Sequence, residues 1–335
     1  MKRVLTPPIA LATLLLAGSL QTAGAAESTP AVLFDSAGKH DRSFNQSAYE
    51  GAEAYSKATG KRYTEFSLTN ESQREQALQR LAQRGGNPVV SIGYTGATAL
   101  DKVAPQFPKT QFYIIDSTVD QPNVRSYVFR DHEGSFLVGA LAAMKSATGK
   151  IGFVGGMDIP LIRRFACGYE QGAHYVNPKV VVLQNMTGTT PMAWNDPTKG
   201  GELARSQIER GADVIFAAAG GTGIGVYQAV KDAGKYAIGV DSNQNHLHPG
   251  TMLTSMIKRV DVAVQTAFTQ SAGSTAVSGG VTTMGLKERG VDWALDADNR
   301  ALVTPEMERK VNAIRQDIID GKIKVTDSMA TGKCD

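Results

Sequence analysis

Short apolar runs alternate with longer stretches of helical periodicity along most of this 335-residue chain. The runs are rich in β-branched and aromatic residues without strict alternation, which is typical of strands covered by helices on both faces. Between two of them, residues 71–85 place Ala77, Leu78 and Leu81 on one side of a helix. The pattern predicts a βαβ series and hence an α/β fold. The strands are expected at 31–35, 62–67, 88–93, 111–116, 150–156, 180–186, 213–219 and 236–241.

The alternation breaks at two places. After Asp116 a second strand-like run, 124–129, precedes a helix expected at about 132–147, and the polar stretch 242–250 leads into the run 251–257. Chains that cross between two α/β lobes often do so at such breaks, so we expect two lobes with a ligand cleft between them. The first lobe should comprise 31–129 and about 250–283, and the second about 130–249 and 284–330.

The N-terminus has the features of a secretory signal peptide. Lys2 and Arg3 precede an apolar run at 9–17, and small residues follow up to Ala25, so we expect residues 1–25 to be cleaved. The run is shorter than the roughly 18 apolar residues of a membrane span. Ser19 stands where a lipoprotein signal needs Cys. We therefore expect a free, soluble, non-lipidated protein in the periplasm.

Composition narrows the possible partners. The chain has 35 Lys and Arg against 32 Asp and Glu, which indicates neither a nucleic-acid surface nor a polybasic membrane patch. The length after cleavage suffices for two domains. Export permits a disulfide between Cys167 and Cys334, although Cys167 is equally compatible with a small buried apolar residue.

The candidate site residues follow the predicted strands, because ligands of open parallel sheets bind beyond the carboxyl ends of the strands. They combine aromatic rings, carboxylates, amides and glycines, a mixture that suits a ligand with a flat face and hydroxyl groups. The candidates are Asp41, Phe44, Asn45, Tyr94, Asp116, Phe165, Trp194, Gly220, Gly221, Thr222, Gly223, Asp241 and Lys258.

The segment after the first strand contains more polar and aromatic residues than a turn and a helix cap require. Asp41 or Ser43 can cap the following helix. Phe44 lacks an obvious core to join, because Ala48, Ala52 and Tyr55 are the better core positions of that helix. Phe44 is therefore expected to face a ligand.

The glycines at 220–225 do not form a dinucleotide fingerprint. A G-x-G-x-x-G motif starting at Gly221 needs Gly or Ala at position 226, where Val226 stands. These glycines are explained if the backbone approaches a ligand closely there. The alternative is that they only form a tight turn.

Catalytic and metal chemistry have little support. The five histidines show no ligand spacing with the cysteines, and the chain has neither a G-x-S-x-G elbow nor a convincing Cys-His set. Asp116 and Asp241 end strands, where Asp is often only a turn residue. We expect no catalytic residue, metal or cofactor.

Several segments resemble the basic membrane protein family of ABC transporter substrate-binding proteins, whose characterised branch binds purine nucleosides. They are DRSFNQSAYEGAEAY (41–55), EGSFLVGALAA (133–143), FACGYEQGA (165–173), AAAGGTGIGV (217–226), IGVDSNQN (238–245) and LTSMIKRVDVAV (253–264). The resemblance implies a type I periplasmic-binding fold, in which two doubly wound α/β lobes are joined by three crossovers that act as a hinge.

The resemblance also implies roles for individual residues. Phe44 and Phe165 would sandwich the purine, and Asp116 would bind the base edge. Asp241 and Lys258 would hold the ribose hydroxyl groups. Asn45 and the glycines near 220–223 would complete a polar wall, with Tyr94 and Trp194 also lining the cleft. Residues 186–200 match nothing in the family that we can assign.

The first functional hypothesis is a monomeric nucleoside receptor that closes on its ligand and delivers it to an inner-membrane ABC permease. A second keeps the fold and changes the ligand to a free base, a flavin or another aromatic metabolite. A third, an exported nucleoside hydrolase with Asp116 and Asp241 as acid and base, lacks a metal-binding carboxylate cluster near the N-terminus.

Overall fold

The computed structural model describes Met1 and residues 29–271 and 278–334. Apart from Met1, the expected signal peptide lies outside the described residues, and so does Ser19. Within the described ranges, no helix has both the length and the apolar character needed to cross a membrane.

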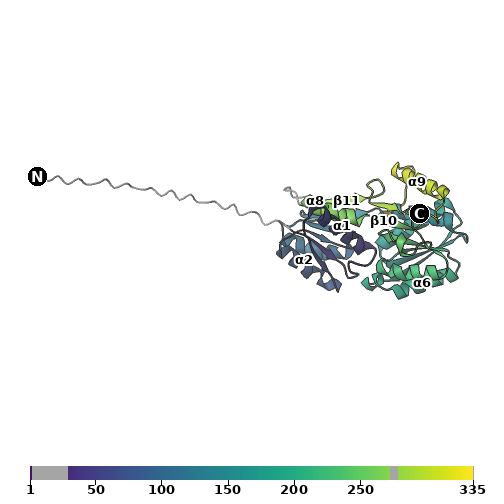
Figure 1. The fold of residues 1–335 in the computed structure, drawn as a ribbon, viewed down its shortest axis with the longest axis horizontal. Coiled ribbons are helices and arrows are strands. Elements are labelled where there is room, and N and C mark those ends of the chain that lie inside the picture. Colours follow the sequence, from purple (N-terminus) through teal and green to yellow (C-terminus); the bar gives the residue numbers. More distant parts are fainter. Residues whose placement is uncertain (2–28, 272–277, 335) are drawn as a thin grey trace.

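The chain forms two α/β lobes, each built on a six-stranded sheet (Figure 1). The first sheet has the strand order β11-β5-β4-β3-β1-β2, and all its pairings are parallel. Its strands are β1 (Thr29–Phe34), β2 (Thr64–Ser67), β3 (Gly86–Ser91), β4 (Phe112–Ile115), β5 (Val124–Phe129) and β11 (Gly280–Met284).

The second sheet has the order β12-β10-β9-β8-β6-β7 and is parallel except for the pair β10–β12. Its strands are β6 (Lys150–Met157), β7 (Val181–Gly188), β8 (Val214–Ala218), β9 (Tyr236–Asp241), β10 (Met252–Lys258) and β12 (Val291–Trp293).

Helices cover both faces of each sheet, which explains why the strand sequences are apolar without strict alternation. The first lobe has α1 (Phe44–Thr59) and α8 (Val260–Ser271) on one face, and α2 (Arg74–Gln83) and α3 (Ala97–Val103) on the other. The second has α4 (Asp131–Lys145) and α5 (Pro160–Val176) on one face, and α6 (Pro197–Glu209) and α7 (Gly223–Asp232) on the other. Two further helices, α9 (Pro305–Ile319) and α10 (Ser328–Thr331), follow near the C-terminus.

The predicted strands are present to within a few residues, and the short strands β11 and β12 are additional. The expected lobe boundary near residue 250 differs from the structure, because β10 pairs with β9 in the second sheet. The chain therefore returns to the first lobe after Lys258. The apolar pattern of β10 identifies a buried strand but contains no information on which sheet it joins.

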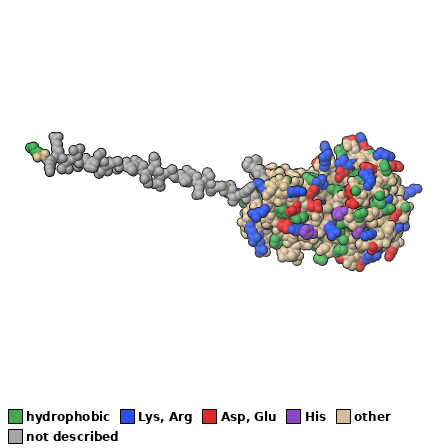
Figure 2. Space-filling view, in the orientation of Figure 1, with side chains coloured by type: hydrophobic (Ala, Val, Ile, Leu, Met, Phe, Trp, Pro, Cys, Tyr) green, Lys and Arg blue, Asp and Glu red, His purple; other side chains and the backbone are tan. Residues whose placement is uncertain are grey.

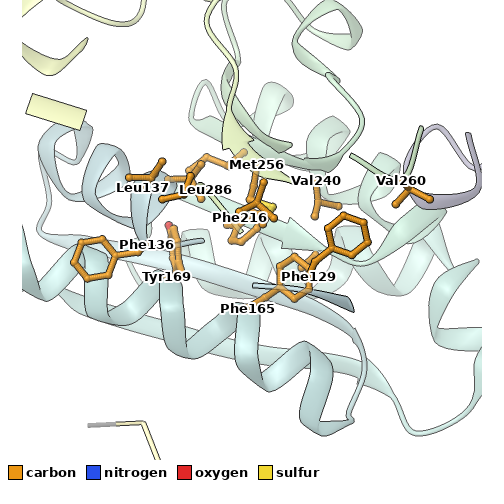
Figure 3. Packing of buried hydrophobic residues seen from close by; sticks show 14 of the residues in the cluster. Phe129, Phe136, Leu137, Phe165, Tyr169, Phe216, Val240, Met256, Val260 and Leu286 are labelled. Atoms are coloured by element: carbon orange, nitrogen blue, oxygen red, sulfur yellow. The ribbon is translucent and has the colours of Figure 1, made fainter. Parts of the chain in front are cut away.

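The lobes are linked by three crossings, at 129–131, 258–260 and 284–291. One hydrophobic core runs through this region, in which Phe129 and Val260 come from the crossings and Phe165 and Val240 from the second lobe (Figure 3). Because the core is continuous there, residues at the crossings have fixed places relative to both lobes.

Cys167 and Cys334 form a disulfide, which decides between the two alternatives left open for Cys167. The bond ties the C-terminal segment to α5. Gln171 on the same helix also exchanges two hydrogen bonds with the backbone of Thr326, at 2.8 and 3.0 Å.

Basic and acidic side chains are interspersed over both lobes on the face shown in Figure 2. This distribution is in line with the nearly balanced charge of the sequence.

Candidate ligand-binding cleft

A pocket with about 700 Å³ of empty space, part of it open to solvent, lies between the lobes at the carboxyl ends of both sheets. Ten of the thirteen candidate residues line it, and Gly221, Thr222 and Gly223 do not. The ten are Asp41, Phe44, Asn45, Tyr94, Asp116, Phe165, Trp194, Gly220, Asp241 and Lys258.

Asp41 organises the start of α1. Its carboxylate accepts hydrogen bonds from the backbone N–H groups of Ser43, Asn45 and Gln46 at 2.8 to 3.0 Å. Asp41 thus satisfies N–H groups that the first turn leaves unpaired. Phe44 begins the helix and faces the pocket.

Ser43 does not cap α1 with its side chain. Instead, its hydroxyl donates a 2.5 Å hydrogen bond to Asp241 Oδ2 in the other lobe. Ser242 Oγ donates to the Ser43 carbonyl at 2.8 Å, and Gln244 Nε2 donates to the Arg42 carbonyl, also at 2.8 Å. The start of α1 is therefore both a wall of the pocket and a contact between the lobes.

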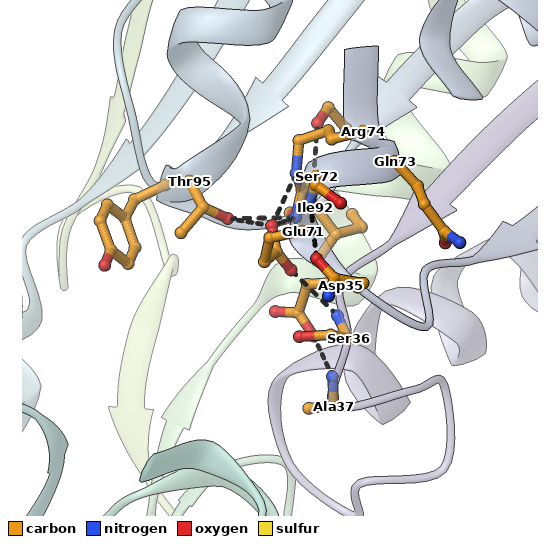
Figure 4. A network of polar contacts seen from close by, with 12 residues as sticks. Asp35, Ser36, Ala37, Glu71, Ser72, Gln73, Arg74, Ile92 and Thr95 are labelled. Carbon is orange, nitrogen blue, oxygen red and sulfur yellow. Dashed lines mark hydrogen bonds and ion pairs between the residues drawn. The ribbon is translucent and has the colours of Figure 1, made fainter. Parts of the chain in front are cut away.

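The outer part of the first-lobe wall is a polar network around Arg74 (Figure 4). The buried guanidinium of Arg74 binds Glu71 Oε2 through Nε and Nη2, and Nη2 also donates to Thr95 Oγ1. Glu71 Oε1 accepts from the backbone of Ser36. This network joins the loops that follow three strands, so the wall is held in place before any ligand arrives.

Asp35 stands beside this network and was not among the candidates. Its Oδ1 accepts a hydrogen bond from Asn45 Nδ2 at 2.8 Å. Burial, reinforced by the nearby Asp41 carboxylate, raises the pKa of Asp35 to about 6. Asp35, Glu71 and Thr95 line the pocket, and their positions after predicted strands are the signal in the sequence that points to them.

Lys258 is the electrostatic centre of the inner wall. Its side chain is 2% exposed, and Nζ lies 2.6 Å from Asp116 Oδ2 and 3.1 Å from Asp131 Oδ1. Nζ also lies 5.3 Å from the ring centre of Phe44 and 5.4 Å from that of Phe165. An ammonium at this distance is attracted to the ring faces.

Burial by itself lowers the pKa of Lys258. The carboxylates of Asp116, Asp131 and Asp241 outweigh that effect and raise the pKa, so the side chain is positively charged. Burial raises the pKa of Asp241 to about 7, with Lys258 and Ser43 opposing the rise.

Asp116 and Asp241 both adopt left-handed backbone conformations, with φ of 69° and 63°. Asp tolerates this region better than most residues, at some cost in strain. Asp116 Oδ1 is buried and has no hydrogen-bond partner among the described residues. A buried acceptor without a partner is uncommon and calls for an explanation such as a ligand donor.

The segment at 186–200 contributes Pro191 and Trp194 to the pocket. Trp194 lies directly on Gly156, where an added Cβ would be only 2.2 Å from its ring. Nearby, Thr222 is fully buried and donates to the Ala193 carbonyl, so it supports this segment and does not line the pocket. Gly223 packs closely against the Tyr227 ring.

Asp131 lies behind Lys258, outside the pocket, and was also missed by sequence reasoning. It begins α4 directly after the first crossing and is 0% exposed. The only available signal was an acidic residue at a predicted helix start, which is commonplace.

Within residues 29–271 and 278–334, no group of three or more His, Cys, Asp or Glu side chains is arranged to hold a metal ion.

Comparison with known proteins places this site in a family. The chain matches the family model described as Bmp, ABC transporter substrate-binding protein PnrA-like, over residues 29–329. It is 34% identical to the "ABC transporter nucleoside-binding protein BmpA" of Lactococcus lactis, over 88% of each chain. It is 37% identical to an uncharacterized lipoprotein of Pyrococcus furiosus, over 79% of this chain and 70% of the relative.

Among solved structures, an ABC transporter solute-binding protein from Aeropyrum pernix superimposes with a TM-score of 0.80 at 30% identity, covering 90% of this chain and 93% of that one. These proteins bind substrates and are not enzymes, so the nucleoside hydrolase alternative is set aside. The chain belongs to the Bmp family of ABC transporter substrate-binding proteins, PnrA-like.

Proposed function

We propose that this protein binds a purine nucleoside in the cleft between its lobes and delivers it to an ABC permease in the inner membrane. The observation that carries the proposal is the meeting of two aromatic rings, Phe44 from one lobe and Phe165 from the other, beside a buried lysine and its carboxylates. This combination suits a flat base and a sugar with hydroxyl groups.

In this proposal the base stacks on Phe44 and Phe165, and the ribose hydroxyl groups bind Asp241 and Lys258. Asp116 was expected at the base edge, and its ion pair with Lys258 brings it beside the ribose end. Its unpaired Oδ1 is available to an N–H or O–H donor of the ligand at either position. Asn45, Tyr94, Trp194 and Gly220 line the remaining walls.

The expected affinity follows from these contacts. Base stacking contributes roughly 1–3 kcal/mol per ring, and a hydrogen bond to a charged group about 1.5–3 kcal/mol. After the entropy lost on association, a dissociation constant of about 0.1 to 10 μM is expected.

We also propose that the protein is exported by cleavage after Ala25 and acts as a monomer in the periplasm. The relative from Pyrococcus furiosus is named a lipoprotein, whereas we propose that this chain carries no lipid. Ser19 in place of a Cys supports a free protein here.

Titration calorimetry with adenosine, inosine, guanosine and adenine tests which of these ligands the protein binds. Binding of a nucleoside at least tenfold tighter than the free base is expected, because only the nucleoside engages Asp241 and Lys258. Phe44→Ala and Asp116→Ala should each weaken nucleoside binding at least about tenfold. Equal affinity for adenosine and adenine would favour a free base, and unchanged affinity in both variants would place the pocket elsewhere.

A further inference from the structure

A chain of buried charges leads away from the cleft, behind Lys258. Asp131 does not line the pocket, yet its Oδ1 lies 3.1 Å from the Lys258 ammonium. Its Oδ2 lies 3.7 Å from Arg164 Nη1, on α5. Asp131 thus stands between a cation that faces the ligand and a cation that does not.

Arg164 is itself firmly held. Its Nη1 donates to the carbonyl of Phe129 at the first crossing, at 2.9 Å. Its Nε and Nη2 each donate to one oxygen of Asp327 at 2.8 Å, a bidentate pair with the C-terminal segment. That segment is tied to α5 by the Cys167–Cys334 disulfide.

The Asp131 side chain faces two cations but makes no ordinary hydrogen bond within the described part of the chain. Neither of its oxygens accepts a hydrogen bond of ordinary geometry from the described residues, although the side chain is 0% exposed. A well-packed apolar residue would commonly be at least as stable in such a place. Burial raises the pKa of Asp131 to about 6, while Lys258 and Arg164 oppose the rise. The two neighbouring cations favour the ionised carboxylate, whose charge acts on both of them.

Lys258 has three N–H donors. Asp116 Oδ2 takes one at 2.6 Å, and Asp131 attracts the ammonium from behind. The two carboxylates hold the ammonium between them, and Lys258 lines the pocket, so a third donor can serve a ligand.

We propose that Asp131 is a positioning residue for ligand binding, which holds the Lys258 ammonium from outside the pocket so that it meets the hydroxyl groups of the ligand. This inference rests on the proposed nucleoside function. It assigns a binding role to a residue that never touches the ligand, with Arg164 as the fixed counter-charge behind it.

The test compares two ligands by calorimetry at neutral pH: adenosine, and 2′,3′-dideoxyadenosine, which lacks the 2′- and 3′-hydroxyl groups of the ribose. Asp131→Asn keeps the shape and removes the charge. It should weaken adenosine binding about tenfold and leave the weaker dideoxyadenosine binding within about twofold of the wild type. A general structural defect would weaken both ligands alike.

Asp158→Asn is the matched control. Asp158 likewise faces an arginine of α5, Arg163, which it binds through two hydrogen bonds, but that pair is exposed and outside the cleft. This variant should bind both ligands as the wild type does.

A second comparison keeps the test valid if Asp131→Asn folds poorly. Asp131→Asn/Arg164→Gln removes both charges of this ion pair together, and Arg164→Gln alone is its reference, because both variants also lose the bidentate pair with Asp327. The double variant should bind adenosine more weakly than Arg164→Gln does. The two variants should bind dideoxyadenosine with the same affinity. Melting temperatures establish that each variant is folded.

The outcomes separate the two proposals. If the wild type binds adenosine and the variants lose nothing, or lose both ligands equally, the positioning role of Asp131 is overturned and the proposed function stands. If the double variant regains the adenosine affinity that Asp131→Asn loses, the role is structural and the inference is overturned. If the wild type binds none of adenosine, inosine and guanosine, the proposed function fails and the inference fails with it.

Discussion

At the residue scale, the inner wall of the cleft is a group of carboxylates gathered around one buried ammonium. Asp116 and Asp241 come from strand ends in opposite lobes, and both reach Lys258 electrostatically. The left-handed backbone conformation of both residues and the crowding of their carboxylates lower the stability of the folded protein. Such costs are typical of binding sites, where the ligand supplies the missing partners.

Asp241 should make the stability of the ligand-free protein fall as pH rises. Its pKa is raised from 3.8 to about 7, first by burial and then by Asp41 and Asp116. Between about pH 4 and 7 the native state therefore holds a proton that the unfolded chain has released, so this contribution to stability is lost as pH rises through about 7.

Asp241→Asn cannot titrate there. Its free energy of unfolding, measured in urea, should increase relative to the wild type between pH 5 and pH 8. Asp120→Asn, at an exposed position, is the control and should follow the wild type. A difference between Asp241→Asn and wild type that stays constant over this pH range would contradict the prediction.

At the element scale, α1 connects helix capping to ligand binding. Asp41 holds the first turn through three backbone N–H groups, and that turn presents Phe44 and Asn45 to the pocket. This explains why the segment before α1 has more polar residues than a turn and a cap require. Asp41 organises the helix, while Ser43 bonds to the other lobe.

Asp41→Ala should lower the free energy of unfolding by about 1–2 kcal/mol, because it leaves N–H groups of the first turn unpaired. It should also weaken nucleoside binding about fivefold, because Phe44 loses its fixed support. Thr304→Ala removes the cap of α9, where Thr304 Oγ1 accepts from Met307 N, and it is the matched control. Thr304→Ala should lower stability and leave affinity unchanged. If Asp41→Ala bound nucleoside with wild-type affinity, the helix cap would not support the ligand site and the prediction would be wrong.

At the scale of the whole molecule, the lobes touch directly beside the pocket. Besides the bonds of Ser43 and Gln244, Tyr94 OH lies 3.1 Å from Met157 Sδ across the cleft. We expect that opening of the cleft breaks these contacts before a ligand can leave.

Ser242→Ala should speed ligand release. It removes the hydrogen bond from Ser242 Oγ to the Ser43 carbonyl, about 0.5–1.5 kcal/mol, which corresponds to a roughly two- to tenfold faster dissociation. Stopped-flow fluorescence of Trp194, which lines the pocket, can follow release.

Thr269→Ala is the control, because it also removes a bond from a hydroxyl to a carbonyl, that of Gln265, but within one helix of one lobe. Equal dissociation rates for Ser242→Ala and Thr269→Ala would show that this lobe contact does not limit opening.

The sequence by itself determined the elements, the α/β class and most of the cleft wall. Periodicity is a local property, and in parallel sheets the residues after strands gather at one edge, so ten candidates could be brought together without coordinates. The breaks in the alternation predicted two lobes, and the resemblance to a family implied the three crossovers that join them.

Only the tertiary structure decided which of these residues meet. The ion pair of Lys258 with Asp116 joins positions 142 residues apart, and the bond of Ser43 to Asp241 joins positions 198 apart. The sheet that receives β10, the pairing of the cysteines and the place of Asp131 behind Lys258 are likewise set by packing. Local sequence patterns hold no record of such distant contacts, because the free energy that selects them arises when the whole chain packs.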